Sequence, residues 1–148
     1  MNKDISISRN EFLTNNKMRD CYYIISASNG MLAYDFYNRA EHDVNHNGHI
    51  LFTAETPQMV VGFIKGRVFN MPDAALAEIE YFYIDSRYRH RGIGRALLAA
   101  YEEHVRSHHN AQGVRLHSAP AIHTLNFYKS SGYRIAGAQY LMTKDFTR

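Results

Sequence analysis

The stretch that decides the fold is "RYRHRGIGRALL", residues 87–98, where four arginines surround a Gly-x-Gly pair that leads into an apolar pattern. Glycine has no Cβ, so a backbone that contains it can approach a ligand closely. The first turn of a helix carries unpaired N–H donors and a partial positive charge. These features together predict a loop that binds an anion at the start of a helix.

Two better-known anion-binding loops fit this stretch poorly. A P-loop needs Lys and then Ser or Thr after its second glycine, whereas Arg95 and Ala96 follow Gly94. A dinucleotide-binding fingerprint would place Gly or Ala where Leu97 stands. From these residues alone, the remaining alternative is a surface helix with a solvated, basic N-terminus.

The flanking patterns predict a mixed sheet with helices around it. Helical spacing of apolar residues predicts helices at residues 31–44, 94–108 and 121–131. β-branched and aromatic runs predict strands at residues 22–28, 49–55, 59–70, 75–85, 113–119, 133–137 and 139–146. We therefore expect one α/β domain over residues 1–148, with about seven mostly antiparallel strands and flanking helices.

Composition excludes several classes of protein. No apolar run approaches the ~20 residues of a membrane span, and the polar N-terminus has no apolar signal core. The single cysteine, Cys21, excludes an internal disulfide and offers no zinc cluster. We therefore expect a cytoplasmic protein that does not associate with membranes.

Neither nucleic acid nor a metal is expected as a ligand. The net charge of +3 is mild, and no helix-turn-helix or RNP-like pattern accompanies the arginines. His42, His46 and His49 lie close together, but Gly48 and two asparagines break the helix that would bring them onto one metal.

Three segments resemble the GNAT superfamily of acyl-CoA-dependent N-acetyltransferases. "RHRGIG" is similar to the family's R/Q-x-x-G-x-G/A signature, with Arg89, Gly92 and Gly94 at its fixed positions. Residues 77–89 resemble the family's fourth strand and following loop, and "LNFYKSSGY" at residues 125–133 resembles its Tyr–Gly helix. The resemblance covers residues 75–146, half of the chain.

The resemblance implies a GNAT-like fold with acetyl-CoA as the co-substrate. In the family, backbone amides of the signature loop bind the pyrophosphate of coenzyme A. That role falls on Arg89, His90, Arg91, Gly92, Ile93, Gly94 and Arg95. The fourth strand separates from the fifth, and the pantetheine arm bonds to the backbone of Phe82, Tyr83 and Ile84. An amide near Ile84 would then polarise the thioester carbonyl.

Two glutamates are candidates for the general base. An alkyl amine has a pKa of about 10.4 and must lose a proton before it attacks. The family resemblance implies Glu78, with Glu80 as an alternative and ordered water as a third. Strand alternation predicts that both share a face with Phe82, opposite Tyr81 and Tyr83.

Tyr128 is the candidate general acid for the departing thiolate. It matches the family's usual tyrosine, and its phenol is a donor with an unperturbed pKa near 10. The alternative from the residues alone is a tyrosine that packs beside Phe127 on an amphipathic helix.

Two departures from the family concern the acceptor and the cofactor arm. Ala121 stands where the family often has an asparagine that contacts the arm. Only about twenty residues separate Ser28 from His49, enough for one helix where the family has two. We therefore expect the acceptor site to be more open, or to be completed by a second subunit of a homodimer.

The expected function is N-acetylation. The acetyl group would pass from acetyl-CoA to a primary amine of a small molecule, peptide or protein, by direct attack in a ternary complex. The alternative is a non-catalytic acyl-CoA-binding sensor, which would not need Glu78, Glu80 or Tyr128.

Overall fold

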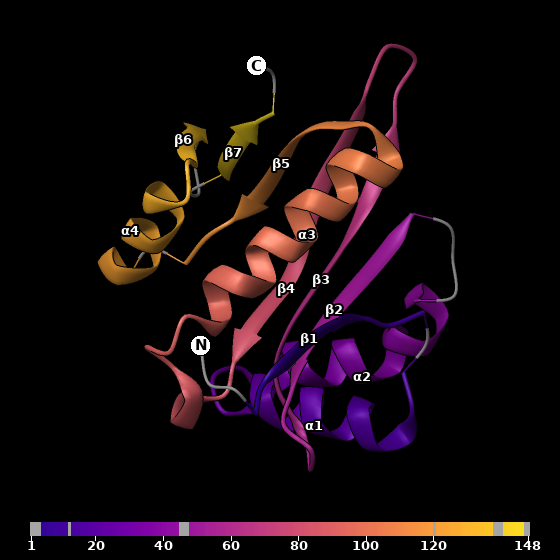
Figure 1. Ribbon diagram of the computed structural model, residues 1–148, viewed down its shortest axis with the longest axis vertical. Helices are drawn as coiled ribbons and strands as arrows, with labels where there is room; N and C mark the ends of the chain where they lie inside the picture. Colours follow the sequence, from indigo (N-terminus) through magenta and orange to yellow (C-terminus); the bar gives the residue numbers. More distant parts are fainter. Residues whose placement is uncertain (1–3, 12, 45–47, 120, 138–140, 147–148) are drawn as a thin grey trace.

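The computed structural model in Figure 1 describes residues 4–11, 13–44, 48–119, 121–137 and 141–146, without the side chains of residues 40–44. The described elements are, in order, β1 (Ser6–Arg9), α1 (Asn15–Ser26), α2 (Gly30–Val44), β2 (His49–Glu55), β3 (Val60–Asn70), β4 (Ala75–Ile84), a 3-10 turn (Ser86–Tyr88), α3 (Ile93–His109), β5 (Ala111–His117), α4 (Ile122–Ser130), β6 (Arg134–Gly137) and β7 (Leu141–Asp145).

One seven-stranded sheet organises the molecule, in the order β1-β2-β3-β4-β5-β7-β6. The β4–β5 pair is parallel, and every other described pair of neighbours is antiparallel. Figure 1 shows α3 lying along one face of this sheet, whereas α1 and α2 lie together at one end. The predicted α/β class and the predicted mostly antiparallel sheet are confirmed. None of the described helices has the length and apolar composition that a membrane span requires.

The two faces of the sheet bury separate hydrophobic clusters. α3 and α4 pack on one face around Leu97, Tyr101 and Tyr128, all buried. α1 and α2 pack on the other face, where Phe36 meets Phe63 at 5.1 Å between ring centroids. The sheet therefore separates a side that contains α3 from a side that contains α1 and α2.

The predicted strand at residues 22–28 is wrong, because this segment belongs to α1. The Thr14 hydroxyl accepts a hydrogen bond from the Lys17 amide at 3.3 Å and caps the helix. Met18, Cys21 and Ile25 are then buried at helical spacing. This apolar stripe outweighs the local β-branched run, because its burial against the sheet contributes more than propensity does.

The first strand is instead β1, a short polar segment at the sheet edge. It pairs with β2, where Ser6 lies opposite Glu55 and Arg9 opposite Phe52. Two helices rather than one therefore separate the first two strands. The prediction of only one helix in this place is wrong. The reason to expect a second subunit at the acceptor site therefore no longer holds.

A β-bulge in β4 changes which side chains share a face. Lys65 of β3 pairs with Tyr81, but the next residue, Gly66, pairs with Ile79. Glu80 is therefore the extra residue in β4, and it interrupts the alternation of side chains along the strand.

The bulge overturns the predicted arrangement of the glutamates. Glu78 and Glu80 lie on the α1–α2 side together with Tyr81 and Tyr83, whereas Phe82 packs on the α3 side. The sequence pattern assumed an unbroken alternation, and one inserted residue exchanges the faces beyond it.

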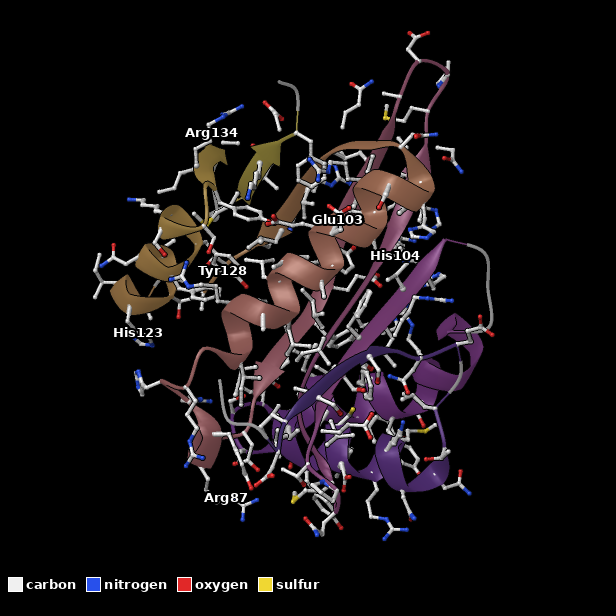
Figure 2. All side chains as sticks on the ribbon, in the orientation of Figure 1. Arg87, Glu103, His104, His123, Tyr128 and Arg134 are labelled. Atoms are coloured by element: carbon white, nitrogen blue, oxygen red, sulfur yellow. The ribbon has the colours of Figure 1, made fainter. Side chains whose placement is uncertain are left out.

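His104 makes the stability of the fold depend on pH. It lies on α3 (Figure 2). Its ring stacks on His108 at 4.4 Å and meets Phe52 edge-on at 5.6 Å between ring centroids. Burial, and then the charges of His108, Arg9 and His109, lower the pKa of His104 to about 4. A histidine in the unfolded chain titrates near pH 6.5, so the unfolded state binds the proton first as the pH falls.

We therefore expect the melting temperature to fall as the pH is lowered from about 6.5 to about 4. Thermal denaturation at a series of pH values measures this, and His104→Gln should give a shallower decline. An unchanged slope in that variant would assign the pH dependence to other groups.

Candidate functional site

A branched cleft opens where β4 and β5 separate. The recorded pairing of the two strands ends at Glu78 and Arg115, and Figure 1 shows β5 turning away from β4 toward α4. The outer part of the cleft has a volume of about 490 Å³ and is lined by Phe82, Tyr83, Ile84, Arg89, His90, Gly94, His123, Thr124, Phe127 and Tyr128. The inner part, about 240 Å³, continues toward the point of separation and includes Glu80 and His117.

The N-terminus of α3 faces the outer part of this cleft. Gly92 caps the helix with φ +82°, a left-handed conformation that favours glycine. The amide of Ala96 bonds to the Gly92 carbonyl at 3.0 Å, so the amides before it have no partner within the helix. A Cβ on Gly94 would lie 3.6 Å from the Phe127 ring. Bare backbone with unpaired donors therefore lines a cavity, an arrangement that suits a phosphate group.

The loop arginines are held by different groups. Arg89 lines the cleft, and its Nε donates to the Ile84 carbonyl at 3.3 Å. Arg95 donates to Ser130 Oγ at 3.4 Å and lies 5.9 Å from the centre of the Phe127 ring. Both arginines therefore hold positive charge beside the cleft, Arg89 directly and Arg95 from the α4 side.

The other signature residues lie further from the cleft. Arg91 donates to the Arg87 carbonyl at 3.3 Å, and the Ile93 side chain is buried in the core. Arg87 binds Asp85 at 2.8 Å, and this hydrogen bond lowers the pKa of Asp85. Of the predicted pyrophosphate-binding residues, Arg89, His90 and Gly94 line the cleft with their own atoms.

The end of β4 forms one wall of the cleft. Phe82, Tyr83 and Ile84, whose backbone is expected to bind the pantetheine arm, all line it. These residues pair with β3 along one edge of β4. Along the other edge they have no pairing with β5, so the backbone groups on that edge are available to a ligand. Burial raises the pKa of Tyr83.

Tyr128 projects from α4 into both parts of the cleft. Its ring lies edge-on to Phe82, with 6.3 Å between centroids, and Figure 2 shows it on the side of α4 nearest α3. Its hydroxyl has no hydrogen-bond partner among the described residues. Burial, with a smaller contribution from Tyr83, raises the pKa of Tyr128, so the phenol keeps its proton at neutral pH.

A buried polar network fixes the position of α4. Tyr133 packs edge-on to Tyr128 at 5.7 Å, and its hydroxyl donates to Glu102 of α3 at 2.9 Å. Lys144 of β7 also binds Glu102 at 2.9 Å and donates to the Ser131 carbonyl at 2.8 Å. These bonds connect α3, β7 and the end of α4, which orients Tyr128.

The structure separates the two candidate bases. Glu80 lines the inner cleft together with Tyr128; its Oε1 lies 3.1 Å from Lys65 Nζ and its Oε2 3.6 Å from Arg67 Nε. Glu78 accepts a hydrogen bond from Arg115 Nε at 2.9 Å and does not line the cleft. Glu80, but not Glu78, therefore shares a cavity with Tyr128.

Several lining residues were missed by sequence reasoning. Thr124 and Phe127 lie three residues apart on α4, and helical spacing alone could have placed them beside Tyr128. His117 and His123 carry no comparable signal. The side chains of His42 and His46 lie outside the described residues.

Comparison with known proteins agrees with this geometry. Residues 14–133 match the "Acetyltransferase (GNAT) family". No curated protein sequence matches the chain.

Several solved structures share the fold. An acetyltransferase of the GNAT family from Staphylococcus aureus has a TM-score of 0.77 at 17% identity, over 96% of this chain and 100% of that one. The PaiA N-acetyltransferase from Thermoplasma acidophilum in complex with coenzyme A has a TM-score of 0.73 at 15% identity, over 95% and 99%. An aminoglycoside 6′-acetyltransferase type Ii has a TM-score of 0.77 at 21% identity, over 95% and 98%. With 120 consecutive positions matched to the family and its fold reproduced, this chain belongs to the GNAT acetyltransferase family.

Proposed function

We propose that the protein transfers an acetyl group from acetyl-CoA to a primary amine in the cytoplasm. The observation that carries this proposal is the cleft, in which the unpaired amides of the α3 N-terminus, the free edge of β4 and the Tyr128 phenol face one cavity. Such a cavity offers a site for phosphates, a site for an extended arm with amide groups, and a proton donor. Coenzyme A carries phosphates and an arm of this kind, and its thiolate needs a proton when it leaves.

The donor is held by backbone in this proposal. The pyrophosphate binds at the amides of residues 92–95, with Arg89 and Arg95 nearby. The pantetheine arm lies along Phe82, Tyr83 and Ile84. An amide of this segment stabilises the negative charge that forms on the thioester oxygen during attack.

The reaction then needs proton transfers at the amine and at the thiolate. The ammonium form of the amine first gives one proton to Glu80, directly or through water. The amine nitrogen then bonds to the thioester carbon and the carbon–sulfur bond breaks. The thiolate takes the proton of Tyr128, and the second proton of the nitrogen returns to Tyr128 through water. We favour Glu80 over Glu78, because Glu80 lines the cleft while Arg115 holds Glu78 outside it.

A turnover assay tests the proposal. The purified protein is mixed with acetyl-CoA and a panel of primary amines, and the release of free thiol is followed. Amine-dependent thiol release is the expected result. Tight binding of acetyl-CoA without turnover on a broad panel would instead support the acyl-CoA sensor.

Tyr128→Phe should lower kcat by about 100-fold while the affinity for acetyl-CoA stays the same. The substitution removes the acidic proton but keeps the ring that packs on Phe82. Because the hydroxyl has no partner among the described residues, its loss should not destabilise the fold. Tyr34→Phe on the exposed surface of α2 is the matched control, and normal turnover by Tyr128→Phe would remove Tyr128 from the mechanism.

A further inference from the structure

We propose that the amine acceptor also carries a carboxylate, which Arg67 and Arg115 bind beside the inner end of the cleft. This inference rests on the proposed function and adds the chemical class of its second substrate. It follows from a row of side chains that crosses the sheet on the face opposite α3.

The strand register places these side chains side by side. Arg67 of β3 lies opposite Glu78 of β4, which lies opposite Arg115 of β5. Arg115 in turn lies opposite Thr143 of β7. Because paired residues point to the same face of a sheet, these four side chains form one row.

Both arginines are accessible and lean on one aromatic ring. The side chains of Arg67 and Arg115 are 41% and 38% exposed. Their guanidinium carbons lie 4.2 Å and 5.4 Å from the centre of the Phe69 ring. Both guanidinium groups therefore lie near the Phe69 ring, although they come from β3 and β5, which lie on either side of β4.

The hydrogen-bonding capacity of this row is largely unused. Arg115 donates through Nε to Glu78, and no acceptor among the described residues takes its terminal NH₂ groups. Arg67 Nε is buried without a hydrogen-bond partner, because Glu80 Oε2, with which it forms an ion pair, lies 3.6 Å away, beyond hydrogen-bonding distance. Thr143 Oγ1 is also buried without one. Buried donors normally have an acceptor, and a carboxylate binds two guanidinium N–H groups at once.

The position of the row sets the size of the acceptor. Arg67 reaches Glu80, and its own place in the register lies three steps along β3 from the residue that pairs with Phe82, so the row lies roughly 7–10 Å from Phe82. If the thioester lies beside Phe82, the amine and the carboxylate are separated by at least about six bonds of extended chain. A small ω-amino acid or a diamino acid that reacts at its side-chain amine has this span.

Matched acceptors test the proposal directly. With acetyl-CoA saturating, kcat/KM is measured for 6-aminohexanoate and for its neutral analogue 6-aminohexanamide. The carboxylate should be preferred by at least about tenfold, and the shorter 4-aminobutanoate should lose part of this preference. Equal kcat/KM values for the acid and the amide would overturn the proposal.

Variants then assign the preference to the row. Arg67→Gln should lower the ratio of the two kcat/KM values by about tenfold, and Arg67→Lys should recover part of it. Arg106→Gln is the matched control, because it removes a positive charge from the exposed surface of α3, on the opposite side of the sheet from the row. Equal effects of Arg67→Gln and Arg106→Gln would mean that only overall charge matters, and would contradict the subsite.

A binding measurement separates this inference from the proposed reaction. Calorimetric titration of 6-aminohexanoate into the protein saturated with coenzyme A reports on the subsite without turnover. Binding that Arg67→Gln weakens, without any acetyl transfer, would support the subsite and refute the transferase. Acetyl transfer to neutral amines, with no binding preference for the acid, would do the reverse.

Discussion

Gly94→Glu should abolish the binding of acetyl-CoA, weakening it by at least about 100-fold. The new side chain would start against Phe127 and Ile84 and extend into the cleft. Its carboxylate would occupy the place proposed for the pyrophosphate and repel it at close range. Isothermal titration with acetyl-CoA measures the loss.

Two further substitutions at this position separate charge from size. Gly94→Gln adds nearly the same volume without the charge, so a smaller loss than that of Gly94→Glu would identify repulsion. Gly94→Ala places a methyl group at ordinary contact distance from Phe127 and should raise the melting temperature, because alanine favours a helix. Unchanged affinity of Gly94→Glu for acetyl-CoA would overturn the site assignment.

Gly66→Ala should destabilise the fold by more than about 4 kcal/mol or prevent folding. Gly66 faces the bulge of β4, where the Tyr101 hydroxyl donates to the Glu78 carbonyl at 2.8 Å. A Cβ on Gly66 would overlap both of these oxygens. Because one of them is backbone in the centre of the sheet, no side-chain rotation relieves the clash.

Chemical denaturation measures this effect. Gly30→Ala is the control, since a Cβ at the first residue of α2 would have nothing within 4 Å, and its stability should stay the same or rise slightly. A Gly66→Ala variant as stable as that control would mean that the bulge can move away from Tyr101.

The sequence predicted the elements whose local pattern and burial agree. β2 follows the predicted bounds, and α3 begins one residue before the predicted Gly94. The predicted strand at residues 22–28 was wrong because Ile24 and Ile25 are β-branched, whereas the helical apolar stripe that contains them begins further upstream. The strand β1 was not predicted, because three of its four side chains are exposed and no apolar alternation marks it.

Residues of the candidate site were predictable where a single short segment carries a recognisable pattern. The loop before α3, the end of β4 and Tyr128 each carry a local signature, and the structure places Arg89, Gly94 and Tyr128 on one cavity. The surroundings of the glutamates were not predictable, because they depend on register. Lys65 and Arg67 reach Glu80 only because Gly66 faces the bulge.

The bulge at Glu80 also limits how β4 can change during evolution. Loss of Glu80 itself would remove the bulge and leave Ile79 and Phe82 on the α3 side and Tyr81 and Tyr83 on the other side. Such a deletion would keep both hydrophobic clusters but remove the carboxylate that lines the inner cleft. Loss of any other single residue of β4 would instead bring side chains of one cluster onto the face of the other. The bulge is therefore the one place where this strand can shorten without exchanging its faces, and a relative that lacks it is expected to lack Glu80 as well.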